Sequence, residues 1–292
     1  MIEELFAEFE GAFAENTIRS YRSDFSRFSR WCDENDLAPL DATSEDLAGF
    51  AEYLAKTCVG STVRRHVASI SSILKLSGRE DIGKGAPVVL AMKRIYRRKG
   101  RWQRQAIPLT HNVLQALLAE CDDSHRGLRD RVMLRLGYET MRRRHELCSF
   151  RFEDLEQLPS GKAALRLRFS KTDQYGAGKL IPISEVLHGD IQRWGELTGN
   201  TGYLLRRVYR KGEIGSDLHP GGIARRLQEL QQQAGLELGG KLSGHSFRVG
   251  AALDLLERGE SLEKIMLRGG WQAESTVVAY LRSWQASQDI EP

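Results

Sequence analysis

The chain has 292 residues, 41% of them hydrophobic and 28% charged, and its formal net charge is +4. A chain of this length is expected to form two domains, and its average composition excludes disordered, collagen-like and disulfide-stapled proteins. Its apolar runs are only a few residues long, which excludes a membrane span, and its first residues do not resemble a secretion signal.

The N-terminal part of the chain predicts a compact bundle of helices. Apolar side chains recur every three or four positions in residues 18–31, which is typical of the buried face of a helix. Thr43 followed by Asp46 resembles a capping box that opens another helix. Ser61 or Thr62 is the candidate cap of the next helix, whose apolar residues again recur at helical spacing.

A short basic stretch follows these helices. Residues 93–104 (KRIYRRKGRWQR) carry seven Lys or Arg side chains and no Asp or Glu, whereas residues 1–92 are net acidic. A further helix is expected to start near Pro87, a residue tolerated in a first turn, and to run into this stretch. Arginines outnumber lysines 32 to 11, and the guanidinium group suits bidentate contact with phosphate. An anionic partner is therefore favoured, with a solvated basic linker as the alternative of equal weight.

A glycine and a proline next to the basic stretch mark a domain boundary. We expect a helical domain at residues 1–98, a basic linker at 99–107 and a second domain at 108–292. Residues 164–169 and 179–183 are β-prone and have turn formers between them, so they predict an antiparallel hairpin. The predicted fold class is mainly α: an all-α bundle followed by an α+β domain with a small antiparallel sheet.

The cysteines and histidines do not predict a metal site. His145 and Glu146 do not begin a zinc motif, because Ser149 stands where H-E-x-x-H needs its second histidine. The cysteines lie far apart and include no C-x-x-C pair, which predicts reduced thiols in a cytosol. The four are Cys32, Cys58, Cys121 and Cys148.

Seven residues of the second domain stand out by their order and spacing. An R-x-x-E pair is followed by a lysine in the predicted hairpin turn, by G-H-x-x-R-V-G-A-A, by G-G-W, and by a tyrosine nine residues after that tryptophan. Residues three apart would share one face of a helix. Taken singly, each is more often a core or surface residue than a functional one. The seven are Arg143, Glu146, Lys171, His245, Arg248, Trp271 and Tyr280.

Together these motifs resemble those of the tyrosine recombinase (phage integrase) family, especially of members with a tryptophan where many have a second histidine. The resemblance covers nearly the whole chain, from the N-terminal helices to the last motif. It implies that Tyr280 is the nucleophile and that Arg143 and Arg248 clamp the scissile phosphate of DNA. It also implies that His245 and Trp271 contact this phosphate.

The resemblance further implies that Lys171 is the general acid and that Glu146 orients the site. Lys179, at the far side of the same hairpin, is the alternative general acid. A tyrosine hydroxyl has a pKa near 10 and needs a neighbour that accepts its proton, for which His245 is the candidate. Because a phosphotyrosine ester replaces a phosphodiester, we expect no nucleotide, metal ion or other cofactor.

DNA contacts are also predicted apart from the resemblance. Cations of the basic stretch that reach phosphates would give salt-dependent, sequence-independent affinity. Arginine pairs near the starts of two helices are candidates for reading base edges, although solvated arginines are the competing interpretation. The predicted DNA-binding residues are Arg64, Arg65, Lys93, Arg94, Arg97, Arg98, Lys99, Arg101, Arg104, Arg225 and Arg226.

The resemblance implies a site-specific DNA recombinase that works through a 3′-phosphotyrosine intermediate. Its expected partner is double-stranded DNA with inverted-repeat half-sites, bound by a homodimer on one site and by a tetramer that exchanges strands through a Holliday junction. The expected location is the bacterial cytoplasm, at the nucleoid, for a bacterial or phage-encoded protein. The alternatives are a type IB topoisomerase, a telomere resolvase, a catalytically silent DNA-binding regulator and, as the weakest, a helical protein-interaction module.

Overall fold

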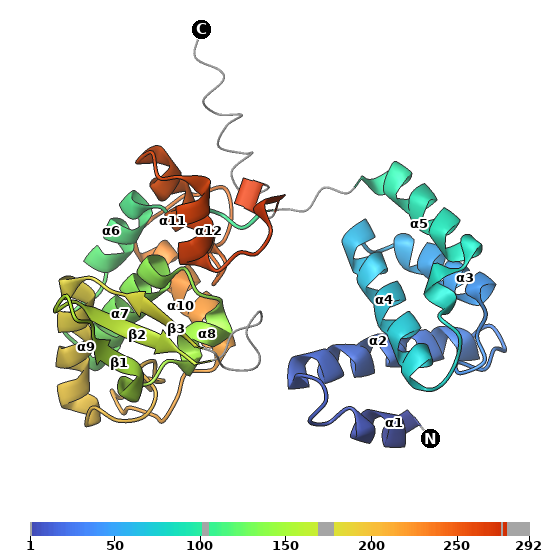
Figure 1. Cartoon of the computed structure of the whole chain (residues 1–292), viewed down its shortest axis with the longest axis horizontal. Coiled ribbons are helices and arrows are strands. Elements are labelled where there is room, and N and C mark those ends of the chain that lie inside the picture. Colours follow the sequence, from blue (N-terminus) through green and yellow to red (C-terminus); the bar gives the residue numbers. More distant parts are fainter. Residues whose placement is uncertain (1, 101–104, 169–177, 276, 279–292) are drawn as a thin grey trace, which may run out of the picture. The chain divides into compact units, whose positions relative to one another are not determined.

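The computed structural model describes residues 2–100, 105–168, 178–275 and 277–278 (Figure 1). The chain divides into two compact units, Met1–Arg104 and Gln105–Pro292. The predicted fold class is confirmed, since helices dominate both units and a small antiparallel sheet lies in the second. Among the described residues, every helix is too short or too polar to cross a bilayer.

The first unit is a helical bundle around an aromatic core. Phe28 and Phe50 are fully buried with ring centroids 5.0 Å apart, and the Trp31 ring lies 5.6 Å from Phe50. The Phe28–Phe50 pair is edge-to-face, and such a pair contributes about 0.5–1.5 kcal/mol beyond the area it buries. The elements are α1 (Ile2–Glu8), α2 (Glu15–Asp33), α3 (Ser44–Ala55), α4 (Gly60–Leu76), the 3-10 turn η1 (Ile82–Lys84) and α5 (Ala86–Lys99).

The predicted starts of α3 and α5 are confirmed, whereas the predicted capping residue of α4 is wrong. Thr43 Oγ1 accepts from the Asp46 backbone N–H, and the Asp46 carboxylate accepts from the Thr43 backbone N–H, as in a capping box. Helix α5 has a proline in its first turn. Helix α4 begins at Gly60 without a side-chain cap, so Ser61 and Thr62 lie inside its first turn. A Cβ at Gly60 would lie 3.1 Å from the Tyr96 ring of α5, so helix packing determines where α4 starts.

The second unit packs helices around a three-stranded sheet. The sheet order is β1-β2-β3, both pairs antiparallel, and Leu165 of β2 faces Leu155 and Ile181. Strands β2 and β3 are the predicted hairpin; the sequence did not predict the short β1. The elements are α6 (His111–Ala119), α7 (His125–Thr140), α8 (Arg144–Ser149), η2 (Phe152–Asp154), β1 (Leu155–Gln157), β2 (Ala163–Leu167), β3 (Lys179–Pro182), α9 (Glu185–Thr198), α10 (Pro220–Gln233), α11 (Ser246–Glu257) and α12 (Leu262–Gly269).

Helix α11 is held in place by two close approaches. A Cβ at Gly137 of α7 would lie 2.6 Å from the Phe247 ring, so α7 and α11 pack with no room for a side chain there. A Cβ at Gly250 would lie 1.9 Å from the backbone oxygen of Leu109. The Leu109 N–H donates to the Ser246 carbonyl at 3.0 Å. These contacts fix the start of α11, where the H-x-x-R motif lies.

Candidate active site

The R-x-x-E and H-x-x-R motifs each lie at the start of a helix. Arg143 immediately precedes α8 and Glu146 is its third residue. His245 immediately precedes α11, and Arg248 is its third residue. The three-residue spacing therefore joins an N-cap position to the first turn of its helix, whereas the sequence had predicted two residues on one helix face.

Glu146 binds Arg143 through both its carboxylate oxygens. Oε1 accepts from Arg143 Nη1 at 3.0 Å and Oε2 accepts from the Arg143 backbone N–H at 3.1 Å. The Glu146 side chain is 1% exposed. Burial opposes its ionisation, yet the hydrogen bonds from Arg143 and the charges of Arg143 and Arg142 hold its pKa below the ordinary value. Glu146 is thus an ionised carboxylate that fixes the Arg143 guanidinium.

Arg248 is buried beneath the site. Its Nη1 donates to the Met141 carbonyl and, at 3.0 Å, to the Gly269 carbonyl. Its Cζ lies 4.3 Å from the centroid of the Trp271 ring, which is cation–π geometry. Arg248 therefore joins the turn that ends α7 to the turn that ends α12, and part of its donor capacity serves the backbone.

His245 lies close to both predicted phosphate clamps. Burial, followed by the positive charges of Arg248 and Arg143, lowers its pKa. The loop before His245 contacts the start of α8, since a Cβ at Gly244 would lie 2.8 Å from the Arg144 Cβ. A histidine with a lowered pKa is a neutral imidazole at neutral pH, which is the form that accepts a proton.

The structure brings together five of the seven predicted residues. These are Arg143, Glu146, His245, Arg248 and Trp271. Lys171 and Tyr280 lie outside the described residues, as do Arg101 and Arg104 of the basic stretch. The alternative general acid, Lys179, donates through Nζ to the Leu267 carbonyl, and burial and the charge of Arg142 lower its pKa. The choice between Lys171 and Lys179 stays open.

Sequence reasoning missed Arg142. Its side chain is 2% exposed, its Nε donates to the Thr140 carbonyl at 2.8 Å, and its Nη2 donates to the Arg268 carbonyl. The sequence shows three consecutive arginines at 142–144, and nothing in their local pattern identifies the buried one.

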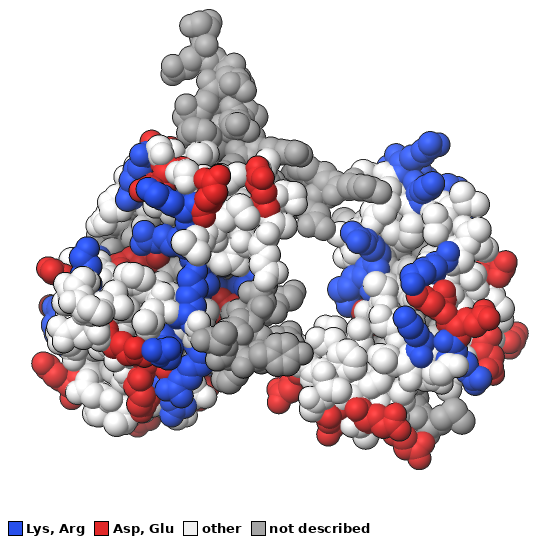
Figure 2. Space-filling model, in the orientation of Figure 1, with Lys and Arg blue, Asp and Glu red and all other residues white. Residues whose placement is uncertain are grey.

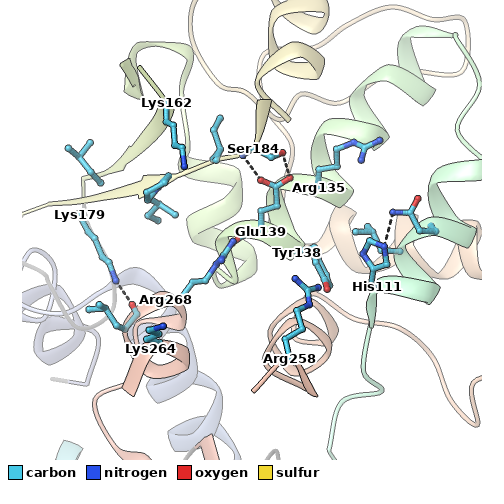
Figure 3. Close-up of a pocket in the computed structure, with 17 residues that line it drawn as sticks. His111, Arg135, Tyr138, Glu139, Lys162, Lys179, Ser184, Arg258, Lys264 and Arg268 are labelled. Carbon is cyan, nitrogen blue, oxygen red and sulfur yellow. Dashed lines mark hydrogen bonds between the residues drawn. The ribbon is translucent and has the colours of Figure 1, made fainter. Parts of the chain in front are cut away.

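A cavity of about 740 Å³ lies beside the site, along β3 (Figure 3). Residues 180–183 of β3 and the following loop give it an apolar wall, and Lys179 and Arg268 lie at one end. Among the described candidates, Arg143, Glu146, His245, Arg248 and Trp271 do not line it, whereas Lys179, the alternative general acid, does. The cavity therefore borders the candidate active site at Lys179.

In the first unit, the structure groups cations that the sequence left apart. Arg27 and Arg30 of α2 line a cavity of about 430 Å³ together with Thr62 and Arg65 of α4. Arg65 is half exposed and donates to the buried carboxylate of Asp24 at 2.6 Å. Arginines beside hydroxyl groups suit phosphate contact. Arg27 and Arg30 were visible only as arginines interspersed in a predicted helix.

Helix α5 carries five exposed predicted cations, and Figure 2 shows Lys and Arg over its C-terminal end. Arg94 and Arg98 both form ion pairs with Glu52 of α3. Arg97 and Lys99 have no ion pair within the described part of the chain. Lys93, the fifth of these cations, is exposed, and so is Arg64 near the start of α4.

The two predicted arginines of α10 differ. Arg225 is exposed. Arg226 is 13% exposed and pairs with Asp130 at 2.6 Å and with Glu229 at 3.0 Å. Arg226 thus lies in an ion-pair cluster in which it and Arg129 both bind the buried carboxylate of Asp130.

Comparisons with known proteins cover most of the chain and agree with one another. The model of the phage integrase family matches residues 108–286, and that of the N-terminal SAM-like domain of phage integrases matches residues 4–80. An integrase/recombinase XerD homolog of Selenomonas ruminantium is 29% identical over 96% of this chain and 85% of its own length. Recombinase Cre of Escherichia phage P1 is 26% identical over 93% of this chain and 85% of its own.

Solved structures share the fold. A lambda integrase tetramer bound to a Holliday junction has a TM-score of 0.67 at 17% identity, covering 96% of this chain and 76% of its own. XerH recombinase in a post-cleavage complex with palindromic difH DNA also has a TM-score of 0.67, at 14% identity, covering 94% and 79%. At these identities the likeness shows the fold alone.

Proposed function

Because the chain belongs to the phage integrase family, we propose that it is a site-specific DNA recombinase that cleaves and rejoins strands through a 3′-phosphotyrosine intermediate. The observation that supports this most is the convergence of the starts of α8 and α11, which lie far apart in the sequence. His245 is close enough to Arg143 and Arg248 for both guanidinium charges to lower its pKa. Two cations and a neutral base at one place suit attack on a phosphodiester.

In the proposed reaction the Tyr280 hydroxyl attacks the scissile phosphorus. Neutral His245 accepts the phenol proton as the Tyr280 oxygen bonds to phosphorus, and the bond to the 5′ oxygen breaks. Lys171 or Lys179 protonates that leaving oxygen. The reverse steps, with a 5′ hydroxyl as nucleophile, rejoin a strand without an external energy source, because the phosphotyrosine ester conserves the bond.

The two arginines stabilise the charge that builds up on the non-bridging oxygens. Removing one such preorganised donor typically costs about 3–4 kcal/mol of transition-state stabilisation. Arg143 is held for this by Glu146, and Arg248 by the carbonyls of Met141 and Gly269. This electrostatic work needs no metal ion.

The partner that fits this chemistry is double-stranded DNA with inverted-repeat half-sites. Two copies of the chain would bind one site, and four would exchange strands through a Holliday junction, the assembly named for the lambda integrase structure. The exposed cations of α4 and α5 supply phosphate contacts in the first unit. The bacterial cytoplasm, at the nucleoid, is the proposed location.

The test begins by selecting a bound duplex from a random-sequence library with the full chain. The selected duplex is then incubated with the protein, and a covalent adduct is sought on a denaturing gel, with and without EDTA. We expect an adduct in both conditions, and we expect Tyr280→Phe to bind the duplex without forming one. An adduct in Tyr280→Phe, or a strict Mg²⁺ requirement, would contradict the proposal. Relaxation of supercoiled plasmids that lack the selected site would instead indicate a type IB topoisomerase.

A further inference from the structure

The C-terminal end of α7 is covered by arginines. A helix leaves its last carbonyls without partners inside the helix, and their partial negative charge attracts cations. Three consecutive carbonyls here each accept from a guanidinium group. Glu139 O accepts from Arg268 Nε at 3.2 Å, and Thr140 O accepts from Arg142 Nε at 2.8 Å. Met141 O accepts from Arg248.

The C-terminal end of α12 is covered in the same way. Its last carbonyls, those of residues 267, 268 and 269, accept in order from Lys179, Arg142 and Arg248. Figure 3 shows the Lys179 side chain reaching from β3 toward α12. Two side chains, Arg142 and Arg248, therefore bond to both helix ends at once and tie the turn at residues 139–141 to the turn at residues 267–271.

Of these two buried arginines, Arg142 is the one that takes no part in the proposed chemistry. A Cβ at Gly270 would lie 2.7 Å from Arg142 Nη1, so the guanidinium group lies directly against the backbone of the turn. Gly270 has a φ of +68°, which glycine adopts at little cost. Burial lowers the pKa of Arg142, and the carbonyl dipoles of the two helix ends stabilise its charge. Its Nε and Nη2 donate to the Thr140 and Arg268 carbonyls, so this guanidinium group serves the backbone of the two turns.

We propose that Arg142 is a positioning residue for DNA cleavage. It precedes Arg143 directly, and the turn that it holds leads into Trp271, whose ring packs on Arg248. Arg142 thereby sets the place of Arg143 relative to Arg248 and Trp271. This inference rests on the proposed recombinase function. A misplacement of about 1 Å in a catalytic group can cost about 100-fold in rate.

The first experiment compares three variants of the full chain on the selected duplex, with Kd and the adduct rate at saturating DNA as readouts. Arg142→Met removes both carbonyl contacts and keeps the side-chain length, and Arg142→Lys restores a cation. Arg131→Met is the matched control on α7, because Arg131 is also partly buried and donates to the Cys121 carbonyl at 2.7 Å and to Asp123 at 2.9 Å.

We expect Arg142→Met to lower the saturated rate by roughly 10- to 100-fold with Kd within about twofold. Arg142→Lys should regain part of the rate, and Arg131→Met should keep it.

The second experiment measures backbone hydrogen exchange without DNA. We expect the amides of residues 267–271 to exchange faster in Arg142→Met and Arg142→Lys than in the parent, and to be unchanged in Arg131→Met. Unchanged exchange in the Arg142 variants, or an equal loss of rate in Arg131→Met, would overturn the positioning role. If Arg142→Met does not fold, the Arg142→Lys comparison decides. A parent protein that forms no adduct refutes the recombinase function alone, because the exchange measurement does not depend on DNA.

Discussion

At the scale of single residues, the protonation states in the site depend on which ionisable side chains are buried and which charges lie beside them. Glu146 is buried and stays ionised because Arg143 binds it twice. The pKa of His245 is lowered first by burial and then by the charges of two nearby guanidinium groups, which favour the neutral imidazole. The same physical effect, a neighbouring arginine, therefore favours the charged form of the acid and the neutral form of the base. Both outcomes suit an anionic substrate and a proton acceptor.

We predict that Arg143→Met raises the pKa of His245, because it removes a positive charge that disfavours the imidazolium. NMR titration of histidine-labelled protein without DNA measures this value directly. The adduct rate of the parent should accordingly survive as the pH falls to 6.5 and decline only through the lower folded pKa. Arg144→Met, which removes an exposed neighbouring cation, is the control and should leave the pKa of His245 unchanged. An unchanged value in Arg143→Met would show that this charge does not reach the imidazole.

Replacing Glu146 should destabilise the second unit. Glu146→Ala leaves the Arg143 contacts unmade at a cost of about 1–3 kcal/mol, and Glu146→Gln should cost less because an amide oxygen can still accept a hydrogen bond. Urea unfolding measures both. Because folding lowers the pKa of Glu146, the contribution of the carboxylate is present above the ordinary value of 4.5 and lost as the pH falls through the folded pKa. A gap between the parent and Glu146→Gln that does not shrink below pH 4.5 would contradict this account.

At the scale of elements, close packing decides where helices begin and how deep they lie. Gly60 lets α4 start against Tyr96, and Gly250 lets α11 lie directly on the backbone of Leu109. Helix α11 carries the H-x-x-R motif at its first turn, so the position of Gly250 fixes the depth of that motif in the unit. The absence of a side chain at Gly250 thus helps to position the site.

Two glycine-to-alanine variants should have opposite effects on stability. Gly250→Ala places a Cβ 1.9 Å from the Leu109 oxygen, and we expect it to lower the free energy of unfolding by about 1–3 kcal/mol or more. Gly189→Ala, within α9, has nothing within 4 Å of the added Cβ and should raise it by about 0.5–1 kcal/mol. Thermal or urea unfolding of both variants checks the pair. A neutral Gly250→Ala would mean that α11 and residue 109 shift apart easily.

At the scale of the whole molecule, positive charge is concentrated on a few surfaces. Outside residues 93–104 the first unit is net acidic, so its affinity for DNA depends on the helix ends where arginines gather. Ion pairs within the protein occupy some of these cations, since Glu52 pairs with two of the five on α5. Charge counted along the chain therefore overestimates the number of cations that are ready to meet a phosphate.

The salt dependence of DNA binding should separate the two groups of cations on α5. The double variant Arg97→Gln, Lys99→Gln should lower the slope of log K against log salt by about 2, because each phosphate that a cation neutralises accounts for about 0.9 of that slope. Glu52→Gln releases Arg94 and Arg98 from their ion pairs and should tighten binding at low salt. Titration of the selected duplex at several salt concentrations measures both effects. If the double variant kept the parent slope, Arg97 and Lys99 would not bind phosphates.

Local patterns in the sequence were enough to predict most of the helical framework, whereas the candidate site residues were predicted from the resemblance of their combined motifs to a known family. The capping box at Thr43 and the periodic face of α2 were predictable because their interactions lie within one or two helical turns. Through that resemblance, the order and spacing of the motifs pointed to Arg143, Glu146, His245, Arg248 and Trp271, and their catalytic roles stay predictions. The short β1 was not predictable, since three partly exposed residues carry no alternation.

Only the tertiary structure decided which arginines are buried and what they bind. Arg142 and Arg143 are neighbours in a run of three arginines, yet Arg142 meets a carbonyl 126 positions away. Arg226 likewise bonds to Asp130, 96 positions earlier, while its neighbour Arg225 is exposed. The sequence by itself determined most helices, because these depend on near neighbours, and it displayed the motif, because the order and spacing of residues can be read without their contacts. The partners of each charge depend on which distant segments pack together and exclude water, so they became visible only in the folded chain.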